Sequence, residues 1–133
     1  NVIKNATSFN FNGPSGEVTM LEGSVAASTG DGHKIFSVCS GYIDSTSSKV
    51  YWIRMYLRDT PTSSYVLTST TKVKATTDIA TPFTIAGGTT AVKTGEVGVK
   101  ITIRRYGSNG TTPDGSTAFD YVRERTCFIE GVR

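Results

Sequence analysis

Apolar and polar residues alternate along residues 49–59 of the chain. The apolar side chains that recur at every second position are Tyr51, Ile53, Met55 and Leu57. Successive side chains of a β-strand point to opposite faces of its sheet, so this period of two predicts a strand with one buried face. A helix would be conceivable only over residues 49–58. It is disfavoured there because valine, isoleucine and aromatic side chains lose rotamer freedom in a helix.

Six further segments show strand-like patterns between turn signals. Together the seven predicted strands cover residues 17–28, 34–44, 49–59, 65–75, 82–86, 96–106 and 117–132. Glycine, proline, aspartate and serine cluster between them, as they do in turns. Seven short strands at such intervals are typical of an all-β, antiparallel β-sandwich, with a barrel as the alternative. We also expect a β-bulge at Gly23, inside the first strand.

The chain is expected to form a single domain over residues 1–133. It contains neither an internal repeat nor a linker-like stretch, and its length suits one domain. Residues 1–16 are rich in asparagine and glycine, which predicts a loose N-terminal arm or a short edge strand. The 21 threonines and 14 serines of the chain favour an all-β protein, since threonine favours strands and serine favours turns and exposed edges.

Two cysteines, Cys39 and Cys127, indicate where the protein works. Their separation of 88 positions does not fit a CxxC motif or a zinc site. An even cysteine count in a β-rich chain predicts a disulfide between them and a secreted, extracellular protein. The chain opens at Asn1, as a mature form or a cloned fragment would. Two buried free thiols in a cytosolic protein are the alternative. No apolar run approaches a membrane span.

The other face of the strand at 49–59 carries aromatic rings and cations in alternation. The even positions are Val50 and, after it, Trp52, Arg54, Tyr56 and Arg58. The strand at 96–106 places Lys100 and Arg104 on its polar face, and residues 72–74 contribute Lys72 and Lys74. If these strands share a sheet, its outer face is cationic. Residues 49–109 carry nine Lys and Arg against three Asp and Glu, whereas the whole chain has a net charge of only +3.

Two interpretations of this face compete. A solvated antiparallel sheet carries Lys, Arg and Thr without any partner, and cations at its edge discourage aggregation. Alternatively, the same rings and cations bind a ligand, with Trp52, Arg54, Tyr56, Arg58, Lys100 and Arg104 as its candidate residues. We expect a non-catalytic binding module for a polysaccharide, a cell-surface polymer or a protein partner. Nucleic-acid binding by a β-barrel and a structural or assembly subunit are the alternatives, and the oligomeric state is left open.

Catalytic chemistry has little support in the sequence. His33 is the single histidine, and Asp31 lies two residues before it. This pair keeps a small secreted hydrolase among the alternatives, because a histidine beside a carboxylate can transfer protons. A turn residue is the simpler explanation. No nucleotide-binding or nucleophile motif is present, and we expect no catalytic residue, metal site or cofactor.

Overall fold

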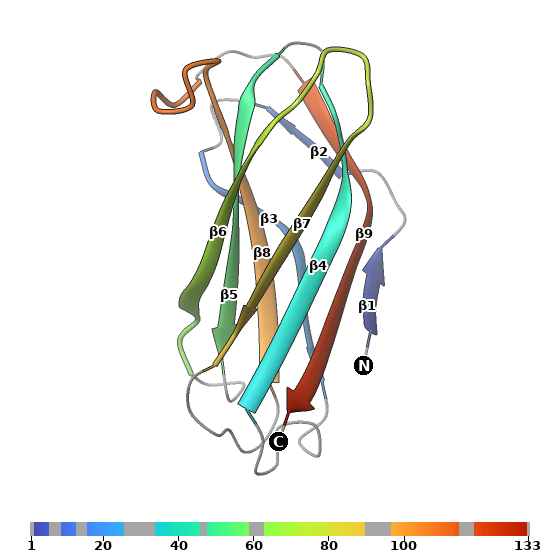
Figure 1. Ribbon diagram of the computed structural model, residues 1–133, viewed down its shortest axis with the longest axis vertical. Helices are drawn as coiled ribbons and strands as arrows, with labels where there is room; N and C mark the ends of the chain where they lie inside the picture. Colours follow the sequence, from blue (N-terminus) through green and yellow to red (C-terminus); the bar gives the residue numbers. More distant parts are fainter. Residues whose placement is uncertain are drawn as a thin grey trace.

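The computed structural model describes residues 2–5, 9–12, 16–25, 34–45, 48–58, 63–89, 97–114 and 119–132. Nine strands run through these residues (Figure 1). They are β1 (Val2–Asn5), β2 (Phe9–Asn12), β3 (Val18–Val25), β4 (Lys34–Asp44), β5 (Val50–Arg58), β6 (Val66–Lys74), β7 (Thr81–Gly88), β8 (Val97–Tyr106) and β9 (Phe119–Val132). The segments from β3 to β9 correspond one by one to the seven strands predicted from the sequence.

The strands form two antiparallel sheets that pack face to face. One sheet has the order β1-β9-β4-β7, with β2 also paired to β9, and the other has the order β3-β8-β5-β6. Because β1 and β2 pair with successive parts of β9, they act as one interrupted edge strand. Counted so, the two sheets have the strand order of a jelly roll. The predicted antiparallel β-sandwich is confirmed, and the barrel alternative is wrong because the strands form two separate sheets.

The core lies between the sheets and follows the predicted alternation. Along β5 the odd-numbered side chains are buried and the even-numbered ones are half-buried on the outer face. The buried positions are Tyr51, Ile53, Met55 and Leu57, which match the apolar positions of the sequence pattern. Ile53 lies directly opposite Ile103 of β8, and both are fully buried. Burial of these side chains is the main force that holds the two sheets together.

A disulfide joins Cys39 of β4 to Cys127 of β9, as predicted. The two residues lie directly opposite each other in the antiparallel pair, and both face the core. The bond therefore links two neighbouring strands of one sheet rather than the two sheets. Such a bond is typical of proteins that fold in an oxidising compartment. In the described part of the chain, no helix is long and apolar enough to cross a membrane.

Three irregularities interrupt the strand pairing. In β3 the register shifts between Thr19 and Leu21, whereas Gly23 stays in register with Val99. The bulge expected at Gly23 is therefore wrong by a few residues, since a glycine in a strand does not by itself displace the backbone. The second irregularity is a bulge in β9, where Glu124 has a positive φ of 54°. The third lies in β6, where Thr68 is the extra residue opposite β5.

Candidate functional site

The predicted cationic and aromatic face is the outer surface of the sheet β3-β8-β5-β6. Strand β5 lies between β6 and β8, so the three strands that carry the pattern share one sheet, as expected. Cross-strand pairing sets their outward side chains in rows. One row joins Lys72, Trp52 and Arg104, and another joins Tyr56 to Lys100. The sequence thus predicted which residues meet on this face, while their role in binding stays a prediction.

Trp52 is half-buried and is held from several sides. Its ring stacks on Tyr106, with 4.4 Å between the ring centroids and 19° between the ring planes. The Lys72 ammonium lies 4.2 Å from the centroid of the indole, and the Arg54 guanidinium lies 5.3 Å away. Attraction between a cation and the face of a ring favours both positions. Trp52 therefore orders the cations around it rather than presenting a bare ring to solvent.

A tight loop after β8 fixes the polar edge of this tryptophan. The indole Nε1 donates a hydrogen bond of 3.0 Å to the carbonyl oxygen of Gly110. Gly110 has a φ of +76°, a conformation that suits glycine. The Asn109 side-chain oxygen accepts hydrogen bonds from the backbone amides of Thr111 and Thr112, which closes the turn. The loop therefore fixes the orientation of the Trp52 side chain.

A second group of rings and cations lies further along the same face. The Lys100 ammonium is 4.8 Å from the ring centroid of Tyr56 and 4.9 Å from that of Tyr65. The Arg58 guanidinium lies 4.6 Å above Tyr65. Burial, followed by the charge of Glu22, raises the pKa of Tyr65, so its ring stays neutral at physiological pH. The four side chains form a continuous ladder that extends the cationic face beyond Trp52.

One carboxylate, from Glu17, neutralises part of this face. It forms an ion pair with Arg54 and accepts a hydrogen bond of 2.7 Å from the Tyr56 hydroxyl. Partial burial alone would raise the pKa of Glu17, but the hydrogen bonds from Tyr56 and Arg54 and the charge of Arg54 lower it overall. The hydrogen bond to Glu17 in turn raises the pKa of Arg54. At neutral pH Glu17 is therefore an internal anion on a cationic surface.

This arrangement predicts that Glu17 contributes to stability only while it is ionised. Its pKa is lower in the folded state, so the contribution is present above the ordinary value of 4.5 and is lost as the pH falls through the folded pKa. We expect Glu17→Gln to reduce the free energy of unfolding by about 0.5–1 kcal/mol at neutral pH. Urea unfolding at about pH 7 and about pH 3 should show the two proteins converging at the acidic value. A difference of equal size at both values would contradict the assignment.

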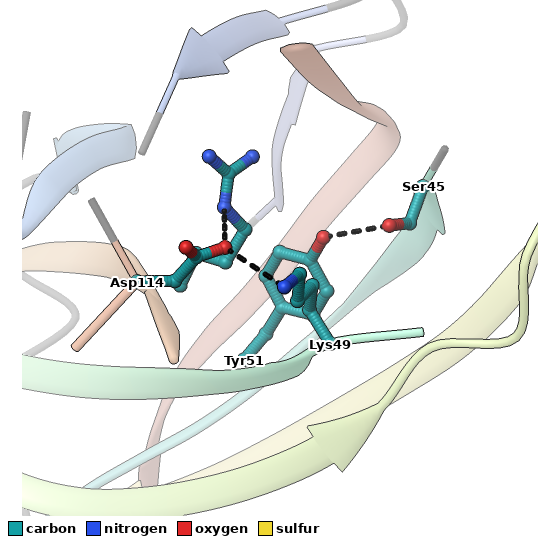
Figure 2. A network of polar contacts seen from close by, with 5 residues as sticks. Ser45, Lys49, Tyr51 and Asp114 are labelled. Carbon is teal, nitrogen blue, oxygen red and sulfur yellow. Dashed lines mark hydrogen bonds and ion pairs between the residues drawn. The ribbon is translucent and has the colours of Figure 1, made fainter. Parts of the chain in front are cut away.

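A buried ion pair lies at the end of the sandwich next to the Gly110 loop (Figure 2). The Asp114 carboxylate is 3.0 Å from the Arg105 guanidinium and 3.5 Å from the Lys49 ammonium. Arg105 is almost fully buried, because it lies opposite the core residue Tyr51. The Tyr51 hydroxyl donates a hydrogen bond of 2.9 Å to Ser45 in the same region. The carboxylate of Asp114, a loop residue, thus pairs with the Arg105 guanidinium on the core side of β8.

Sequence reasoning missed three parts of this site. Glu17 and Gly110 contact the predicted residues from distant segments of the chain, and Tyr65 contacts Arg58 from the end of the following loop. No local pattern marks these three residues. Among the described residues, no three acidic, histidine or cysteine side chains gather as a metal site would require. His33 lies outside the described residues, so the hydrolase alternative stays a prediction.

Comparisons with known proteins support the fold. No protein-family model matches the sequence, and no curated protein is significantly similar to it. A viral particle of infectious bursal disease virus contains a chain with a TM-score of 0.65 and 12% identity, over 98% of this chain and 31% of that one. The VP2 subviral particle of the same virus gives 0.63 and 13%, over 98% and 32%. This chain thus spans about a third of the length of those proteins, and it shares a fold with part of them.

Proposed function

We propose that this chain is a non-catalytic interaction domain that binds an anionic polymer, such as an acidic polysaccharide at a cell surface. One observation carries the proposal, namely the concentration of positive charge on the outer face of the sheet β3-β8-β5-β6. Six cations share this face with two carboxylates. The cations are Arg54, Arg58, Lys72, Lys74, Lys100 and Arg104, and the carboxylates are Glu17 and Glu22.

The spacing of these charges suits an extended ligand. Outward side chains of one strand are about 7 Å apart, so the distance from Trp52 to Arg58 is roughly 20 Å. Neighbouring strands add cations at about 5 Å to either side. Several repeating units of a charged polymer can therefore contact the face at once. Each contact is weak in water, and many of them together give useful affinity.

The aromatic rings of this face already contact other side chains, which favours a ligand that binds through charge rather than by stacking. Tyr106 already stacks on Trp52, and Lys72 lies over the same indole. A sugar or a base could stack on Trp52 only by displacing one of these groups. The nucleic-acid alternative depends on such stacking more than an acidic polysaccharide does. The rings therefore support the proposal by fixing the cations in place.

Binding to a panel of polyanions tests the proposal. At about 50 mM salt the protein should bind at least one sulfated or uronic acid polysaccharide, and affinity should fall steeply by about 500 mM salt because the contacts are screened. Lys72→Ala with Arg104→Ala should weaken binding about tenfold, since both cations flank Trp52. Lys34→Ala with Arg123→Ala removes two cations from the other sheet and should leave affinity within about twofold. Binding that ignores both salt and the first pair of changes would contradict the proposal.

The disulfide supports an extracellular setting for this activity. Disulfides persist in the oxidising environment outside the cell. Acidic polysaccharides of cell surfaces are found in the same environment. Extracellular location is part of the proposal and can be checked from the redox state of Cys39 and Cys127 in protein taken from its natural source.

An assembly subunit is the second candidate function. It is favoured by the fold likeness to chains of infectious bursal disease virus particles, which extends over 98% of this chain. The outer face of the other sheet also exposes Phe36 and Phe128, each about half accessible to solvent. Sedimentation at several protein concentrations tests this candidate. Growth of a larger species that Phe36→Ser with Phe128→Ser abolishes would support assembly through that face.

A further inference from the structure

The outer face of the sheet that contains β4, β7 and β9 carries a hollow of about 480 Å³. Three of its lining residues are small hydroxyl side chains that stand in one row across the sheet. Ser40 of β4 pairs with Thr84 of β7 on one side and with Thr126 of β9 on the other. These small side chains leave a depression beside the bulkier row that contains Tyr42 and Pro82.

The neighbouring row on one side forms a wall of the hollow. There Tyr42 pairs with Pro82, and Tyr42 is 39% exposed. This wall lies two residues along the strands from the hydroxyl row, or about 7 Å away. The hollow is large enough to accept one sugar ring.

A carboxylate completes the rim of the hollow. Opposite Gly41, strand β9 has two residues, Glu124 and Arg125, which form the bulge. The extra residue reverses the alternation, so Glu124 is exposed on the outer face while Arg125 is buried on the inner face. Glu124 lines the hollow and has a φ of 54°, a strained conformation for a residue with a side chain. The bulge therefore holds an acceptor beside the hydroxyl row.

The strands that form the hollow are cross-linked. The disulfide links Cys39 to Cys127, the immediate neighbours of Ser40 and Thr126. The Arg123 guanidinium, which lies over the Tyr42 ring, forms an ion pair of 2.8 Å with Asp44, so these two side chains offset each other's charge. Glu124 is then the uncompensated charge among the lining residues. A negative rim disfavours the polyanion that suits the opposite sheet.

We infer that this hollow is a binding site for a neutral sugar residue. Hydroxyl side chains both donate and accept hydrogen bonds, as sugar hydroxyls do. A carboxylate can accept from two neighbouring sugar hydroxyls, and these charge-assisted bonds are the stronger ones. The Arg123 guanidinium lies 5.7 Å from the ring centroid of Tyr42, so the opposite face of this ring is the one that the C–H groups of the sugar would contact. The site is independent of the cationic face, since it lies on the other sheet and needs a ligand without negative charge.

A titration with simple glycosides, followed by amide NMR spectra of the ¹⁵N-labelled protein, tests the inference. The probes are the methyl glycosides of glucose, galactose, mannose and N-acetylglucosamine. At least one of them should shift the amides of residues 40–42, 83–84 and 124–126, with a dissociation constant on the order of 1 mM. Salt should leave this affinity unchanged, because the sugar is neutral.

Variants decide whether the hollow itself binds. Tyr42→Ala should weaken binding about tenfold, and Ser40→Tyr should abolish it by filling the hollow while the spectrum of the rest of the fold persists. Glu124→Gln keeps the size of the side chain and should weaken binding severalfold through the loss of charge. Lys72→Ala with Arg104→Ala is the matched control and should bind as the wild type does. Shifts from none of the four glycosides, or undiminished binding by Ser40→Tyr, would overturn the inference.

Discussion

Reduction of the Cys39–Cys127 disulfide is expected to lower the free energy of unfolding by about 4 kcal/mol. The bond closes a loop of 88 positions, and a cross-link over such a distance strongly restricts the unfolded chain. The two residues face each other in the strand pair and are almost fully buried, so reduction leaves the packing of the core largely in place. Urea unfolding of the same protein, with and without a reductant that reaches the buried bond, measures the difference.

The comparison of oxidised with reduced wild type isolates the cross-link, because both sulfur atoms stay in the core. Cys39→Ala with Cys127→Ala should lose a further 1–2 kcal/mol, roughly the cost of two small cavities. An unchanged midpoint after complete reduction, verified by a thiol assay, would show that the unfolded chain is not constrained by this bond. In that case the strand pair β4–β9 would be held by its hydrogen bonds and packing alone.

Local alternation predicted most of the fold, and the bulge in β9 shows where such reasoning ends. A period of two placed the core side chains of β5 from Tyr51 to Leu57 and of β8 from Val97 to Ile103 correctly, because both strands are regular over these residues. In β9 the same counting from the buried Cys127 would place Arg123 inside and Val122 outside. The structure shows the reverse, since Glu124 adds one residue to the strand. Nothing in the local sequence marks Glu124, a residue that does not favour a positive φ.

The sequence predicted which side chains share the outer face of the sheet, but not which other residues contact them. Residues two positions apart on one strand lie on the same face of the sheet, so Trp52, Arg54 and Tyr56 could be grouped from the sequence. The Glu17 carboxylate and the Gly110 carbonyl reach the same face from other segments, and only the fold brings them there. Those contacts change the chemistry. They convert a row of free rings and cations into a face whose rings are engaged and whose charge is partly neutralised.

The hollow on the other sheet was missed for a different reason. Its hydroxyl row combines one residue from each of three strands, and each of them is an ordinary polar residue of a threonine-rich chain. A small side chain has meaning there only because its cross-strand neighbours are also small. Strand pairing over distances of 44 and 86 residues decides this, and sequence patterns within one strand carry no such information.

Asp114→Ala is expected to lower the free energy of unfolding by about 3 kcal/mol, although Asp114 lies in a loop. The carboxylate faces Arg105, whose side chain is only 1% exposed, and removal of one partner leaves a buried guanidinium without its counterion. The effect should extend to the candidate site, since the same loop carries the Gly110 carbonyl that binds Trp52. Trp52 is the single tryptophan, so its fluorescence reports directly on a loosened loop.

Asp44→Ala provides the matched control, because it removes the same side chain from an arginine partner at the surface. The Asp44–Arg123 pair has side chains that are 38% and 42% exposed, and water replaces the lost contact there. We expect a loss below about 1 kcal/mol and unchanged tryptophan fluorescence. Adding Arg105→Met to Asp114→Ala should restore part of the stability, since it removes the buried charge that has lost Asp114. Equal losses for both aspartates, or no recovery in the double variant, would mean that burial of Arg105 does not control the strength of this contact.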